Sequence, residues 1–160
     1  MEIFGKSPIP LPVLILGKLA LGVCCAFFLF KTVWLPWYSS DVTRMAGWAF
    51  YTIGLILFIF AIAQLGSSIR VGLPDEKTIL KTRGLYRFTR NPIYVSIYIV
   101  CLGSCLIVIH PINCGAFLLA MLIHHAIIKK EEKFLEKRFG NEWTAYKQQI
   151  PRYIGFNKTQ

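Results

Sequence analysis

The sequence predicts an all-α protein: a polytopic membrane helix bundle of about four transmembrane helices, in one domain covering residues 1–160. Three observations predict this class. The chain is 55% apolar and 16% charged, whereas soluble domains carry about 25% charged residues. Its apolar residues gather in four long runs, and its Lys and Arg residues gather at the ends of those runs. Together these features are typical of a chain that crosses a bilayer several times.

The four apolar runs are the predicted transmembrane helices. A helix that crosses the hydrocarbon core needs about 17–25 residues, and each run is close to that length. In chain order the runs are Leu11–Phe30, Met45–Leu65, Ile93–Ile109 and Ile112–Ile128. The last two are separated only by His110 and Pro111, which leaves room for no more than a tight turn. They are therefore predicted to form an antiparallel helical hairpin.

The positions of the Lys and Arg residues predict the topology. They are frequent in residues 66–91, between the second and third runs, and in the tail after Ile128, whereas the other two connections hold few. The positive-inside rule then places both termini in the cytoplasm. The net charge of +10 would also suit nucleic acid. Because the charges lie at the ends of apolar runs, membrane lipids with anionic headgroups are the expected partner, and nucleic acid is not.

The C-terminal tail is predicted to be a cytoplasmic, amphipathic and mainly helical segment. Its sequence is "KKEEKFLEKRFGNEWTAYKQQIPRYI". Gly140 is expected to break the first helix, one or two further helical turns follow, and an extended end begins at Pro151.

The hairpin predicts a contact between two polar segments that are distant in the sequence. Each arm has about 18 residues, which is about 27 Å of α-helix. Equal arms bring Arg90, Asn91 and Pro92 level with Lys129–Glu132, a stretch that includes Glu131 and Glu132, on the cytoplasmic rim. Carboxylates directly after a span are unusual, because the positive-inside rule favours Lys and Arg there. They are either a solvated helix start paired with basic residues one turn away, or a site for a ligand's ammonium group or a bound cation. The residues alone leave both interpretations open.

Two motifs identify a family. "GLYRFTRNPIY", a helical hairpin, and "EEKFLEKRFGNEWTAYKQQIPRYI" follow one another in this order. The pattern resembles the isoprenylcysteine carboxyl methyltransferase and phospholipid methyltransferase family of integral membrane enzymes, with a core motif region over residues 72–154. The chain departs from the family pattern at Asn91, where His is frequent, and at Ser96, where Gly is frequent. Asn keeps a donor and an acceptor but carries no proton near neutral pH, so an orienting role suits it better than a base role.

The resemblance implies methyl transfer from S-adenosylmethionine to a lipophilic acceptor at the membrane–cytosol interface. The acceptor is a small molecule or a lipid-modified group, such as a prenylcysteine carboxylate. The resemblance implies cofactor-binding roles for Tyr86, Arg90, Asn91, Pro92, Tyr94, His125, Glu131, Glu132 and Tyr146. It implies that the catalytic residues are Glu132, Arg138 and Arg152. Arg138 or Arg152 would hold the acceptor's carboxylate or an anionic headgroup in a fork of hydrogen bonds, unless their charges simply face the phosphates of the membrane.

Other functions stay open on the sequence. N-methylation of a phospholipid headgroup amine, or methylation of a small thiol or phenol, would suit the same pocket. An NADPH-binding relative of the sterol reductases has a similar tail, and a non-catalytic membrane protein could retain a degenerate site. A metal site is not predicted, because histidine-box oxygenases need many more His residues than the three present. The chain has no Gly-x-Gly, which the soluble nucleotide-binding scaffold requires. Nothing in the sequence predicts the oligomeric state.

Overall fold

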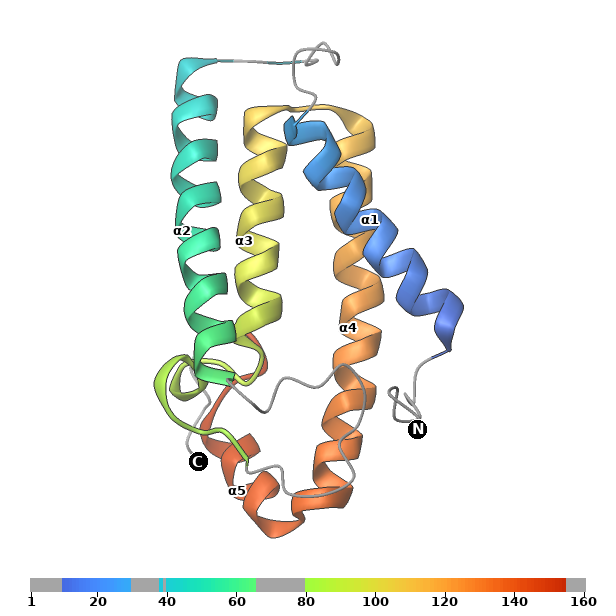
Figure 1. Ribbon diagram of the computed structural model, residues 1–160, viewed down its shortest axis with the longest axis vertical. Helices are drawn as coiled ribbons and strands as arrows, with labels where there is room; N and C mark the ends of the chain where they lie inside the picture. The colour runs from blue at the N-terminus through green and yellow to red at the C-terminus, as the bar shows by residue number, and fades with distance from the viewer. Residues whose placement is uncertain (1–9, 30–37, 39, 66–79, 155–160) are drawn as a thin grey trace.

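The computed structural model describes residues 10–29, 38, 40–65 and 80–154. Within these ranges the chain is helical, with α1 (Leu11–Leu29), α2 (Asp41–Leu65), η2 (Gly84–Arg87), α3 (Pro92–Ile107), α4 (Pro111–Phe139) and α5 (Asn141–Gln149) (Figure 1). The described residues contain no strand, only an isolated antiparallel bridge between Tyr38 and Ile109. The all-α prediction is confirmed. Both termini and residues 72–79 of the motif region lie outside the described residues.

The long helices pack in two pairs. Helix α2 runs along α3, and α1 crosses and packs against α4 (Figure 1). Helix α3 lies between α2 and α4, so it joins the two pairs. Below them, α5 folds back beneath the bundle from the end of α4 (Figure 1).

Glycines allow α2 and α3 to approach backbone to backbone. A Cβ atom on Gly54 would lie 2.7 Å from the backbone nitrogen of Val100, and one on Gly103 would lie 2.6 Å from the backbone nitrogen of Tyr51. Neither position has room for a side chain. Small residues at helix contacts are typical of membrane bundles, where close backbone packing replaces the hydrophobic effect as the attraction between helices.

The connection between α3 and α4 is short and internally bonded. Helix α3 ends at Ile107 and α4 begins at Pro111. Proline is favoured at the first position of a helix, which Pro111 occupies. The ring of His110 caps α4 by accepting a hydrogen bond from the backbone N–H of Ile112 at 3.3 Å. The buried amide of Asn113 donates to the backbone oxygens of Ser104 and Val108 at 3.3 and 3.1 Å. These bonds close the turn.

Helix α4 joins the fourth apolar run to the first part of the tail. It continues without a break for 29 residues, because no Gly or Pro lies between Ile128 and Phe139. It ends at Gly140, whose φ of +53° is left-handed. The predicted break is confirmed there, and the helix that follows, α5, has 9 residues.

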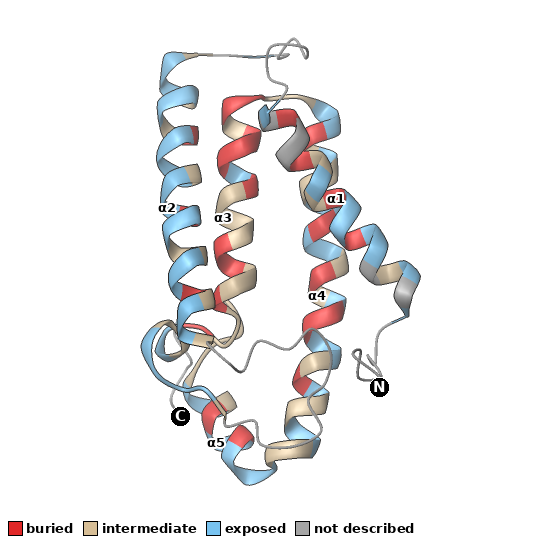
Figure 2. Ribbon diagram, viewed as in Figure 1, coloured by how far each residue is buried: buried red, intermediate tan, exposed pale blue. Residues whose placement is uncertain are grey.

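Much of the apolar surface faces outward. Helices α2 and α4 are each long and apolar enough to cross a membrane, and Figure 2 shows most of α2 as exposed. Ile59 on α2 is 65% exposed and Leu122 on α4 is 70% exposed. Extended exposed apolar faces are unusual on a soluble monomer and suit contact with lipid.

Candidate active site

A buried carboxylate lies between two arginines below the ends of α3 and α4. Arg152 donates from Nε to Oε1 of Glu132 at 3.0 Å and from Nη2 to Oε2 at 2.7 Å. Arg90, just before α3, places Nη1 3.3 Å from Oε1 of Glu132 as an ion pair. The side chains of Glu132 and Arg90 are only 6% and 8% exposed. We call these three residues the Glu132 cluster. The predicted proximity of Arg90 and Glu132 is found.

The Glu132 cluster carries excess positive charge, because two guanidinium groups surround one carboxylate. Burial lowers the pKa of Arg90, and the charge of Glu132 opposes this effect. The hydrogen bonds to Glu132 raise the pKa of Arg152. Nε of Arg90 has no hydrogen-bond acceptor among the described residues, and the guanidinium lies 5.8 Å from the ring centre of Trp143. The cluster therefore has a buried donor available to an anionic group.

The tail is held against the segment that precedes α3. The backbone N–H of Arg90 donates to the oxygen of Pro151 at 2.9 Å. The Thr89 hydroxyl and the Asn91 side-chain amide both donate to the backbone oxygen of Arg152, at 3.0 and 3.1 Å. Asn91 thus orients the tail through a neutral N–H donor, a contact that requires no titrating group.

Glu131 faces a different partner from its neighbour. The Tyr94 hydroxyl donates to its two carboxylate oxygens at 3.2 and 3.3 Å. Glu131 lies three residues beyond the apolar run that ends at Ile128. Burial raises the pKa of Glu131 to about 7, and the bond from Tyr94 partly opposes the shift. This carboxylate is therefore poised to change charge near neutral pH.

His125 contacts the tail from α4. Its Nδ1 lies 2.8 Å from the hydroxyl of Tyr153, whose ring centre is 6.1 Å from that of Tyr98 on α3. Tyr153 therefore lies between α3 and α4. The adjacent His124 is engaged elsewhere, with Nδ1 2.7 Å from the backbone oxygen of Ala120.

The remaining predicted residues lie around the Glu132 cluster, with the exception of Arg138. Tyr146 of α5 donates its hydroxyl to the backbone oxygen of Tyr86 at 2.7 Å, and burial raises the pKa of Tyr86 to about 12. Pro92 is buried at the start of α3. Arg138 lies six residues after Glu132, about 9 Å further along α4 and on another side of the helix. Its guanidinium carbon is 5.9 Å from the ring centre of Phe139.

The sequence reasoning did not identify three residues of this site. Thr89 bonds the tail at Arg152, Tyr153 of the tail bonds His125 of α4, and Trp143 is a 2% exposed residue beside Arg90. Thr89 and Tyr153 directly adjoin predicted residues, and Trp143 precedes Tyr146 by one helical turn. Their positions near the predicted motif residues are the only feature of the sequence that could have indicated them.

Ser96, the second departure from the family pattern, is accommodated inside the bundle. It is 1% exposed, and its hydroxyl donates to the backbone oxygen of Ile93 at 2.7 Å. A Cβ on Gly54 of α2 would lie 3.0 Å from the Ser96 backbone oxygen, so Gly54 provides the space at this contact. In the described part of the chain, no group of three or more His, Cys, Asp or Glu residues could hold a metal ion.

Comparison with known families places the chain in one of them. The profile of the family described as phospholipid methyltransferase matches residues 42–142. The match covers α2, α3, α4 and the start of α5, and with them Glu131 and the Arg90–Glu132 pair. No solved structure matches the chain.

Three similar curated proteins have related names. "Protein-S-isoprenylcysteine O-methyltransferase B" of Arabidopsis thaliana is 27% identical over 98% of this chain and 83% of its own length. A "probable protein-S-isoprenylcysteine O-methyltransferase" of Oryza sativa subsp. indica is 29% identical over 75% of this chain and 63% of its own length. The "protein-S-isoprenylcysteine O-methyltransferase" of Tribolium castaneum is 32% identical over 65% of this chain and 38% of its own length. The alignments thus cover less than two thirds of the rice and beetle proteins.

Proposed function

Because this chain belongs to the phospholipid methyltransferase family, we propose that it transfers a methyl group from S-adenosylmethionine to the carboxylate of a prenylated cysteine. The family match confirms the predicted family and the predicted methyltransferase class. The prenylcysteine acceptor is supported by the names of the similar proteins. The observation that carries the proposal is the Glu132 cluster, a buried site with excess positive charge at the end of the apolar helices.

The charged groups of the site fit the cofactor. S-adenosylmethionine carries an ammonium, a sulfonium and a carboxylate. Glu131 is a half-buried carboxylate that accepts a hydrogen bond from the Tyr94 hydroxyl, and it would hold the ammonium or the sulfonium by charge attraction. Arg90 has an Nε donor without an acceptor among the described residues, and it would hold the carboxylate. The cationic groups and the carboxylate of the cofactor therefore each have an oppositely charged partner in this site.

The protein's own residues would mainly position two reactants and exclude water. When bound, the cofactor supplies a methyl group that is already activated on a sulfonium sulfur, so no general base is needed to activate a carboxylate acceptor. Tyr94 orients the Glu131 carboxylate through its hydroxyl. The hydrogen bonds of Tyr86, Asn91 and Tyr146 would support the site indirectly, because they hold the tail and α5 against the segment before α3. Pro92 fixes the first turn of α3 beside them.

The acceptor carboxylate needs cations, and Arg138 and Arg152 are the two candidates for this role. In the Glu132 cluster, Nε and Nη2 of Arg152 already donate to Glu132, which leaves two N–H groups on Nη1 and one on Nη2 for an acceptor. Arg138 lies in the last turn of α4 and is half-buried. A guanidinium there presents a planar fork that matches a carboxylate. His125, through Tyr153, would order the wall between α3 and α4 that faces the lipophilic chain.

The proposed topology is four transmembrane spans with both termini in the cytoplasm. Helices α2 and α4 meet the length and hydropathy of spans, and α1 and α3 contribute shorter apolar segments. Four spans place the Glu132 cluster and the Lys-rich part of the chain on one side of the bilayer, as the positive-inside rule favours. A prenylated acceptor would then enter from the lipid phase.

A second candidate is N-methylation of a phospholipid headgroup amine, which the description of the family as phospholipid methyltransferase favours. This reaction needs a neutral amine at the site. The excess positive charge of the Glu132 cluster repels the charged form of an amine, which lowers the amine's pKa but also disfavours binding of the ammonium form. An anionic acceptor is the better electrostatic match.

The test compares acceptors with the purified chain in detergent and tritiated S-adenosylmethionine. We expect label on N-acetyl-S-farnesylcysteine and none on the matched amide, which lacks the carboxylate. Label on phosphatidylethanolamine instead would support the second candidate. Binding of S-adenosylmethionine without transfer to either acceptor would contradict the proposed acceptor class, and binding of NADPH or of neither cofactor would contradict methyl transfer.

A further inference from the structure

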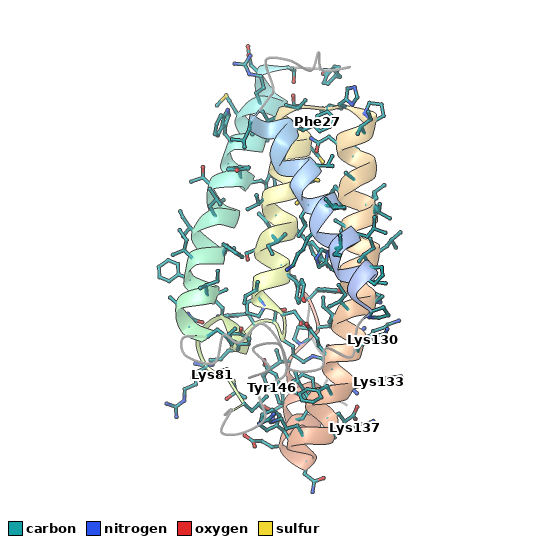
Figure 3. The ribbon with its side chains drawn as sticks, turned by 45° about the vertical axis from the view of Figure 1, so that its right-hand side comes forward. Phe27, Lys81, Lys130, Lys133, Lys137 and Tyr146 are labelled. Atoms are coloured by element: carbon teal, nitrogen blue, oxygen red, sulfur yellow. The ribbon has the colours of Figure 1, made fainter. Side chains whose placement is uncertain are left out.

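One exposed face of α4 changes from apolar to basic along its length. Positions 119, 122, 126, 130, 133 and 137 recur at intervals of three or four residues, so they share one face of the helix. Its upper part consists of Leu119, Leu122 and Ala126, all exposed. Its lower part consists of Lys130, Lys133 and Lys137, also exposed. We call these three lysines the α4 lysine stripe. Figure 3 shows the three following one another down one side of α4.

The stripe points away from the candidate active site. Buried Ala120, Ile127 and Glu132 lie on other sides of the helix. Glu136, the exposed acidic residue closest to the stripe along the chain, forms a 3.6 Å ion pair with Lys147 of α5. Among the described residues, no lysine of the stripe forms an ion pair with an acidic group. The positive charge of this face is therefore presented outward.

From this continuity we propose that the α4 lysine stripe binds the headgroups of anionic phospholipids. The inference rests on α4 crossing the bilayer and is independent of methyl transfer. Leu119 and Leu122 would face acyl chains. The stripe then begins about one helical turn below Ala126 and extends about 10 Å from Lys130 to Lys137, which is enough to cross the headgroup region of one leaflet, about 5–8 Å thick. Lysine stems reach readily from an apolar surface to phosphates.

The charge and position of the stripe favour lipid over a soluble acidic partner. An apolar face and a basic face that are continuous on one helix match the two chemical layers of a membrane leaflet. Clusters of basic residues immediately beyond a span attract anionic lipids. The stripe would also fix the depth of α4, and with it the height of the adjacent Glu131 and Glu132 at the membrane surface.

The experiment measures lipid preference directly. The full chain is placed in nanodiscs of an equal mixture of phosphatidylcholine and phosphatidylserine, and the lipids retained after detergent extraction are counted by native mass spectrometry. We expect the wild type to retain phosphatidylserine preferentially, and K130Q/K133Q/K137Q to lose about tenfold or more of this preference, since each lysine contributes up to about fivefold. The charge-reversed K130E/K133E/K137E should exclude phosphatidylserine.

A charge-matched control separates the stripe from overall charge. K81Q/R83Q/R87Q removes three exposed cations from the segment around η2, and it should keep most of the preference. An equal loss in this control would overturn the proposal in favour of net charge. Unchanged preference in K130Q/K133Q/K137Q would also overturn it, as expected if the stripe binds a soluble acidic partner. Methyl transfer in detergent is measured in parallel, so that failure of the proposed enzyme function is seen separately.

Discussion

Arg152 and Glu132 form a two-pronged ion pair between the tail and α4, with N–O distances of 3.0 and 2.7 Å. The two side chains differ in burial: Glu132 is 6% exposed and Arg152 is 29% exposed. The carboxylate therefore depends more on the pair than the guanidinium does, because a buried charge without a partner is costly. The pair also holds the tail beside Arg90.

Replacing Arg152 should loosen the tail. In Arg152→Gln, Glu132 keeps only its ion pair with Arg90, so we expect the free energy of unfolding to fall by about 2–3 kcal/mol. Arg152→Lys keeps the charge but not the planar fork, and should show a smaller loss. Thermal unfolding in detergent measures both effects. If both variants unfold like the wild type, the pair does not anchor the tail.

Glu131 should make stability depend on pH. Its pKa rises from the ordinary 4.5 to about 7 in the folded protein. Between these values the folded state binds more protons than the unfolded state, so the contribution of Glu131 to the free energy of unfolding falls as pH rises through this window. Thermal midpoints measured in detergent from pH 5 to about 8 should decline for the wild type and decline less for Glu131→Gln.

The same carboxylate should make cofactor binding depend on pH in the opposite direction. Deprotonated Glu131 attracts the cationic groups of S-adenosylmethionine, so we expect about tenfold weaker binding at pH 6 than at pH 8. Equilibrium binding of tritiated S-adenosylmethionine measures this difference. Glu131→Gln should bind weakly at both pH values. A wild-type affinity that is constant across this range would exclude Glu131 from the cation site.

The contact between α2 and α3 should not tolerate a methyl group. In Gly103→Ala the new Cβ would lie 2.6 Å from the backbone nitrogen of Tyr51, and separating the helices should cost about 1–3 kcal/mol of unfolding free energy. Gly22→Ala in α1 is the matched control, because a Cβ there meets no atom within 4 Å. A lower thermal midpoint for Gly103→Ala alone is expected, whereas equal midpoints would refute the close contact.

Arg138 should matter for turnover more than for stability. If it holds the acceptor carboxylate in a fork, Arg138→Lys should raise the KM for the farnesylated acceptor and lower kcat/KM by about tenfold or more, because Lys lacks the planar donor pair. Initial rates at varied acceptor concentration measure this effect. S-adenosylmethionine binding should be unchanged. Full activity in Arg138→Lys would assign the residue to the membrane-facing charge instead.

Much of the fold was predictable because its signals are local. Each apolar run became a helix, since its length and the absence of proline beyond its first turn are properties of consecutive residues. Gly140 ended α4 because a left-handed residue is favourable only for glycine there. The continuation of α4 through Phe139 follows the same logic, because no breaker interrupts it. The motif residues identified the family without any knowledge of their contacts.

The partners within the site required the tertiary structure. The sequence placed Arg90 and Glu132 at one level, from the lengths of two helices. It did not determine that Arg152 completes the cluster, that Asn91 bonds the tail backbone, or that Tyr153 reaches His125. Those contacts depend on where the chain returns after α5. That return is decided by packing and by the need to pair a buried carboxylate, which no local pattern encodes.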